Sequence, residues 1–198
     1  MSSTAEKLIA ETRQLIMHGG YHGFSYADLA ERFGIRKASI HHHFPSKAGL
    51  VVAVIEQQRA RIQAQIASLE SGTPVAIDQL LAYINYWKQC IQYETAPFCL
   101  AGVLAAELPG LPPEVASAVQ GHFNDLRKWL EHVLALGVQQ GTIRLENSPD
   151  IAAEFFQAAV YGAMLMARAY NDPNRFSLVV DAFFRRMRAF KLRRKFHW

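Results

Sequence analysis

Residues 19–50, GGYHGFSYADLAERFGIRKASIHHHFPSKAGL, constrain the fold of this chain more than any other stretch. Ser25 is a good N-cap for a helix over Tyr26–Phe33, because its side chain can accept a backbone N–H of the first turn. Gly34 provides a turn, and a second short helix is predicted over 36–43. The stretch therefore predicts two short helices joined by a tight glycine turn.

The second of these helices displays hydrogen-bond donors instead of apolar residues. Its apolar Ile40 can pack inward, while the neighbouring positions fall largely on other faces of so short a helix. The donors on it are Arg36, Lys37, Ser39, His41, His42 and His43. In a helix-turn-helix, the second helix places such residues against base edges in the major groove of DNA. The pattern therefore predicts a DNA-reading head.

Helical periodicity continues along the rest of the chain, and no strand alternation or internal repeat is convincing. The sequence predicts an all-α fold of nine helices, with Pro and Gly marking most of the boundaries. The expected helices cover about 4–18, 26–33, 36–43, 46–69, 74–94, 99–107, 113–140, 149–170 and 174–190.

Charge is unevenly distributed along the chain. The net charge of +4 divides into +3 for residues 1–61, −5 for 62–171 and +6 for 172–198. An acidic middle excludes a protein coated with nucleic acid throughout, whereas a mildly basic first segment suits DNA. No run approaches the ~20 apolar residues of a membrane span, and the N-terminus has no signal-peptide pattern. We expect a cytoplasmic protein without a membrane partner, in which two cysteines are free thiols.

The first quarter of the chain resembles the TetR family of transcriptional regulators. The residues that match the family's N-terminal signature, over about residues 5–55, are Gly23-Phe24, Ser25 or Tyr26, Leu29-Ala30, Gly34-Ile35, Ser39-Ile40, His43-Phe44, Ser46-Lys47 and Leu50. The resemblance implies a helix-turn-helix DNA-binding domain over 1–48 and a ligand-binding and dimerisation domain over 49–198. It also implies a homodimer on double-stranded DNA with a palindromic operator, controlled by a small-molecule effector.

The resemblance implies DNA contact at the positions of this chain that match the DNA-binding positions of the family. The predicted DNA-binding residues are Ser25, Tyr26, Arg36, Lys37, Ala38, Ser39, His41, His42, His43 and Lys47. Lys37 is the best candidate for reading guanine, and Ser25, His41 and Lys47 are better suited to phosphate. The chain departs from the family pattern at Arg36, where Ser is frequent and caps the helix, at Ala38 for Gly, and at His41 for Tyr. These departures concern which operator is read.

The C-terminal part is expected to supply the dimer interface and the effector site. The last two long helices carry small and apolar residues, which permit close packing between subunits or within one subunit. An apolar pocket with a few hydroxyls is predicted from aromatic residues that could equally be plain core. The predicted ligand-binding residues are Tyr83, Trp87, Cys90, Cys99, Phe123, Trp129, Phe156 and Tyr161. With no charged partner standing out, we expect a neutral, flat or hydrophobic effector.

Cys99 follows Pro97-Phe98 and is expected to open a short helix, whose N-terminus lowers a thiol pKa. The segment from Cys99 to Glu107-Leu108 is similar to that of electrophile- and aldehyde-responsive members of the family, in which the cysteine is the sensor. The alternative for Cys99 is a small buried residue. Cys90 is expected to be buried.

Three other interpretations compete with a regulator. Consecutive histidines on a helix point about 100° apart, so His41, His42 and His43 cannot chelate one ion, and no metal or cofactor is expected. A cysteine enzyme would pair Cys90 or Cys99 with His122 or His132, yet no local motif places them together. A helical interaction scaffold is the third class. The basic tail, Arg185 to Lys195, is best interpreted as a solvated helix end.

Overall fold

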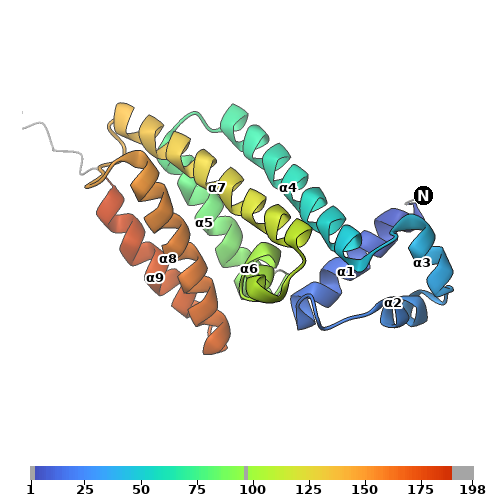
Figure 1. The fold of residues 1–198 in the computed structure, drawn as a ribbon. Coiled ribbons are helices and arrows are strands. Elements are labelled where there is room, and N and C mark those ends of the chain that lie inside the picture. Colours follow the sequence, from blue (N-terminus) through green and yellow to red (C-terminus); the bar gives the residue numbers. More distant parts are fainter. Residues whose placement is uncertain (1–2, 96–97, 189–198) are drawn as a thin grey trace, which may run out of the picture. The chain divides into compact units, whose positions relative to one another are not determined.

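A computed structural model describes residues 3–95 and 98–188 of the chain. Within this part lie nine α-helices and one short 3-10 turn (Figure 1). The helices are α1 (Thr4–Gly19), α2 (Tyr26–Phe33), α3 (Lys37–His43), α4 (Lys47–Gly72), α5 (Ala76–Gln92), α6 (Leu100–Ala105), α7 (Pro113–Gln139), α8 (Pro149–Ala169) and α9 (Asn174–Met187), with the 3-10 turn η1 at Leu108–Gly110. The predicted all-α class and the order of its helices are confirmed. The tail predicted to be solvated lies mostly outside the described residues.

The chain divides into two compact units. The N-terminal unit combines the chain up to Ser68 with Phe98–Leu126, and the C-terminal unit combines the remaining residues. The reading head shares one hydrophobic core with α6 and the start of α7, since Leu8, Leu29 and Ile40 cluster with Leu104 and Val119. The hydrophobic core of the DNA-reading head therefore includes residues beyond position 48. The division into a DNA-binding domain over 1–48 and a ligand-binding and dimerisation domain over 49–198 stays a prediction.

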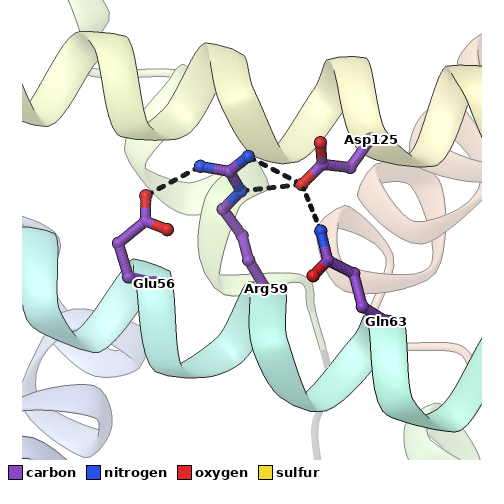
Figure 2. A network of polar contacts seen from close by, with 4 residues as sticks. All are labelled: Glu56, Arg59, Gln63 and Asp125. Carbon is purple, nitrogen blue, oxygen red and sulfur yellow. Dashed lines mark hydrogen bonds and ion pairs between the residues drawn. The ribbon is translucent and has the colours of Figure 1, made fainter.

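A polar network in the N-terminal unit joins α4 to α7 (Figure 2). The Arg59 guanidinium donates from Nε and Nη2 to one Asp125 carboxylate oxygen, both at 2.8 Å, and from Nη1 to Glu56 at 2.7 Å. Gln63 donates to the same Asp125 oxygen at 3.2 Å. Gly121 leaves room for the guanidinium, because a Cβ there would lie 2.6 Å from Arg59 Nη1. The network fixes the register of α4, whose first residue directly follows the reading head, against α7.

The C-terminal unit is held together chiefly by α8 and α9, which pack side by side (Figure 1). Phe156, Met164 and Phe176 are completely buried there, and Val180 nearly so. The loop after α7 pairs with the end of α9, where Arg144 donates its N–H to the Met187 carbonyl at 2.8 Å. These contacts bury one face of each helix and leave other faces of α8 and α9 exposed.

Candidate functional site

The first helix of the reading head begins and ends at local signals in the sequence. The Ser25 hydroxyl oxygen accepts the backbone N–H of Ala27 and Asp28, and Asp28 in return accepts the Ser25 N–H at 2.6 Å. Hydrogen bonds from the Ser25 side chain and backbone hold the pKa of Asp28 below its usual value. Gly34 ends α2 with φ of +61°, a left-handed conformation that costs glycine little. Local signals therefore determine where α2 begins and where the chain turns toward α3.

The second helix presents a polar surface with one buried anchor. Within α3 only Ile40 is buried, at 0% exposure, and it joins the core of the N-terminal unit. The exposed positions are Arg36, Lys37, Ala38, Ser39, His41, His42 and His43. Arg36 occupies the N-cap position and makes no side-chain capping bond. The helix thus leaves its N-terminal donors available, as a helix that enters a DNA groove requires.

Two predicted DNA-binding residues, Tyr26 and Lys47, also make contacts inside the head. Tyr26 is 9% exposed, and its hydroxyl donates to the Phe44 carbonyl at 2.8 Å. Burial, and to a smaller extent Tyr21, raises the pKa of Tyr26 to about 12. Lys47 Nζ donates to the Phe24 carbonyl oxygen and lies 4.5 Å from the centre of the Tyr21 ring. Both side chains brace the helix pair, a role that sequence spacing alone did not distinguish from contact with DNA.

Comparison with known protein families identifies the family of this chain. Residues 8–54 match the family described as bacterial regulatory proteins, tetR family, and residues 76–183 match the family described as tetracyclin repressor-like, C-terminal domain. The chain belongs to the TetR family. It is a DNA-binding transcriptional regulator with a helix-turn-helix, as the N-terminal signature predicted. In the described residues no helix is long and apolar enough to cross a membrane.

Individual TetR-family proteins match along most of the chain. The HTH-type transcriptional repressor DhaR of Mycobacterium sp. strain GP1 is 27% identical over 81% of this chain and 80% of its own length. The HTH-type transcriptional repressor NemR of Escherichia coli K12 is 28% identical over 83% of this chain and 84% of its own. The crystal structure of a TetR-family regulator from Agrobacterium tumefaciens superposes with a TM-score of 0.90 at 44% identity, covering 93% and 97% of the two chains.

In the N-terminal unit, the structure brings Cys99 and His122 together. Cys99 is the N-cap of α6, as expected, and is 4% exposed, and its Sγ lies 3.6 Å from His122 Nε2 on α7. His122 is itself only 4% exposed and packs edge-on against the ring of Phe123. The sequence suggests His122 only as a possible partner of Cys90 or Cys99 in a cysteine enzyme. A histidine among apolar residues at helical spacing was the signal for its burial.

In the C-terminal unit, three of the predicted ligand residues meet in one aromatic cluster. The Tyr83 ring lies 5.5 Å from that of Trp129 and 6.2 Å from that of Phe156, centre to centre. Trp87 and Cys90 are buried on α5, and Tyr161 is half-buried on α8. The indole N–H groups of Trp87 and Trp129 are buried, and no acceptor among the described residues pairs with either.

The predicted ligand set is thus divided, because Cys99 and Phe123 belong to the N-terminal unit and the other six residues to the C-terminal unit. Two chemically distinct features result: a buried thiol–imidazole pair and an aromatic cluster with indole donors. No group of three or more His, Cys, Asp or Glu residues in the described part is arranged to hold a metal ion.

Proposed function

We propose that this TetR-family regulator is a homodimeric repressor that binds a palindromic operator and is released by a small-molecule or electrophilic effector. The observation that carries the proposal is α3, a helix anchored by the buried Ile40, whose exposed positions together with Arg36 before it include two cations and three histidines. The repressors DhaR and NemR, to which the chain is similar, support repression as the direction of control.

In this proposal, Lys37 reads base edges and the neighbouring residues position the head. A long donor in the first turn of α3 suits the O6 and N7 acceptors of guanine. Arg36, Ser39 and His41 are exposed beside it and are assigned to base or phosphate contacts, with Ser25 meeting phosphate at the start of α2. Tyr26 and Lys47 are assigned to bracing the helix pair.

The dimer is proposed to form through exposed apolar faces of α8 and α9. On α8 the side chains of Ile151, Phe155 and Leu165 are 46–58% exposed, and Ala158 and Gly162 lie between them at helical spacing. On α9, Leu178 is 71% exposed and Val179 37%. A stripe of large apolar residues around small ones suits packing against the same stripe of a second copy, because a two-fold interface is self-complementary.

Cys99 is proposed as the point at which an electrophile acts. His122 is close enough to accept the thiol proton, so that the sulfur adds to an electron-poor alkene carbon and the proton returns to the adjacent carbon. The same pair would suit a cysteine enzyme, but membership of a regulator family favours a sensor. A neutral effector can also bind the C-terminal unit, where the unpaired indole N–H groups of Trp87 and Trp129 would donate to its carbonyl oxygens.

Selection of duplexes from a random library tests the DNA-binding part. The full chain is expected to enrich a palindromic sequence, and its affinity for that duplex should fall linearly on a log–log plot against salt concentration. Enrichment of no sequence at all would contradict the proposal.

Treatment with N-ethylmaleimide then tests the thiol. Alkylated wild type should lose at least tenfold in affinity for the selected duplex, Cys99→Ser should lose nothing, and Cys90→Ser should behave as wild type. Equal release of wild type and Cys99→Ser would remove Cys99 as the sensor and leave the indole donors as the effector site.

A further inference from the structure

Glu107 joins the end of α6 to the backbone of the reading head. Its Oε2 accepts the N–H of Tyr21 at 2.8 Å, although the two residues are 86 positions apart. Its Oε1 occupies the place of the side chain that Gly20 lacks, since a Cβ built there would lie 1.6 Å from this oxygen. Gly20 also has φ of +71°, a conformation open to glycine and rare for other residues. Because residue 20 is a glycine, the Glu107 carboxylate can contact the backbone of the segment that leads into the head.

The segment that Glu107 contacts is held from its other end by a charge of opposite sign. Residues 20–24 connect α1 to the Ser25 cap of α2. Lys47, the first residue of α4, donates to the Phe24 carbonyl oxygen and lies 4.3 Å from the centre of the Phe24 ring. Burial lowers the pKa of Lys47, and the nearby carboxylates of Asp28 and Glu107 oppose that shift by attraction. Two charged side chains thus fix the entry to the helix-turn-helix, one from each end.

The other end of α6 is the proposed effector site. Cys99 occupies the N-cap position of α6, and Glu107 lies two residues after the last helical residue. Leu100, Ala101 and Leu104 bury the helix in the core of the N-terminal unit, against α1. A single buried turn-and-a-half of helix moves as a unit, because interiors are close-packed and its hydrogen bonds are internal. A displacement of the N-terminal end of α6 at Cys99 is therefore expected to move Glu107 as well.

We propose that Glu107 is the positioning residue that transmits the state of α6 to the DNA-reading head, through its contact with Gly20 and Tyr21. The inference rests on the proposed function, with Cys99 as the site of the electrophile. In the DNA-binding state the carboxylate holds the loop before Ser25, and with it the orientation of α2 and α3. Alkylation of Cys99 shifts α6 and withdraws the carboxylate, so that the head loses its fixed orientation.

The test compares operator binding and its loss on alkylation in matched variants. Fluorescence anisotropy with the selected duplex is measured with and without N-ethylmaleimide for wild type, Glu107→Ala and Glu70→Gln, the last removing a charge from an exposed residue of α4. Mass spectrometry establishes equal alkylation of Cys99. We expect at least tenfold release in wild type and Glu70→Gln. In Glu107→Ala we expect threefold weaker binding before treatment and less than twofold further loss.

A second measurement separates this inference from the proposed function. Amide exchange of the peptide 19–25 should be at least fivefold faster in Glu107→Ala than in Glu70→Gln, whether or not alkylation releases DNA. Glu107→Gln keeps an oxygen that can accept the Tyr21 N–H, so amide exchange of the peptide should be slow in this variant. If the alanine variant does not fold, Glu107→Gln is compared with wild type instead.

The possible results distinguish the sensor role of Cys99 from the positioning role of Glu107. Absence of release in alkylated wild type would refute the sensor role of Cys99, while faster exchange and weaker binding in Glu107→Ala would still support Glu107 as a link to the head. Release from Glu107→Ala as large as from wild type would overturn the inference. Unchanged exchange together with unchanged operator affinity would overturn it as well.

Discussion

Replacing Leu165 by alanine removes a large apolar side chain from the exposed stripe of α8. The side chain is 58% exposed, so its loss leaves no cavity in the core of one protomer. Alanine also favours a helix at least as well as leucine does. The fold of the protomer should therefore be unaffected, and any change in assembly reports directly on the proposed interface.

The size of the effect follows from the exposed fraction. Burying a whole leucine side chain contributes about 1.5–3 kcal/mol. With 58% of Leu165 still exposed, the contribution left for an interface is roughly 1–1.7 kcal/mol per protomer. A two-fold dimer loses it twice, so Leu165→Ala should weaken dimerisation by about 2–3.5 kcal/mol. This corresponds to a dissociation constant roughly 30- to 400-fold higher.

Sedimentation equilibrium over a range of concentrations measures the dissociation constant. The matched control is Tyr93→Ala, which removes an even more exposed side chain, 74% accessible, from the end of α5. The control should dimerise within about twofold of wild type. A Leu165→Ala variant that dimerises as tightly as the control would refute the assignment of this face of α8 to the interface.

Two further predictions concern the N-terminal unit and are checked by urea unfolding. Tyr26→Phe removes the hydroxyl that donates to the Phe44 carbonyl, and should lower the free energy of unfolding by about 0.5–1.5 kcal/mol. Because the pKa of Tyr26 is raised from 10.0 to about 12, its neutral form favours the folded state, so wild type should lose more stability than Tyr26→Phe as pH rises from 10 to 12; parallel pH profiles would contradict this. Gly121→Ala should stabilise an Arg59→Ala background by about 0.5–1 kcal/mol through helix propensity. In wild type the gain should be smaller, because the new Cβ meets Arg59, and equal gains would show that the network in Figure 2 does not depend on that space.

The elements of the head were predictable because their signals are local. Tyr26–Phe33 forms a helix with the predicted bounds, since Ser25 and Gly34 determine its ends within a few residues of sequence. The third helix begins at Lys37 instead of 36, because Arg36 takes the N-cap position. The helix expected over 99–107 ends at Ala105, where the chain turns toward Leu108–Gly110. The predicted boundaries of these helices are therefore correct to within two residues, at their starts as well as at their ends.

The interior of the candidate sites was not predictable, because it depends on contacts between distant residues. Nothing near Glu107 in the sequence indicates that it meets Gly20, and nothing near Cys99 indicates His122. The same limit applies to Tyr26: its place in the family signature predicted DNA contact, whereas no local pattern indicates the hydrogen bond from its hydroxyl to the Phe44 carbonyl. Helix periodicity identifies buried faces but does not say which faces meet.

The central claim is that α3 reads DNA through donors in its first turn. Lys37→Ala, with Lys7→Ala on the exposed part of α1 as the matched control, tests it most directly. For the selected duplex, Lys37→Ala should lose about 1–3 kcal/mol of binding free energy and should enrich a palindrome with relaxed preference at one base pair of each half-site. The control should keep both the affinity and the selected sequence. A Lys37→Ala variant that binds the original duplex as tightly as the control, with unchanged preference at every position, would contradict the account.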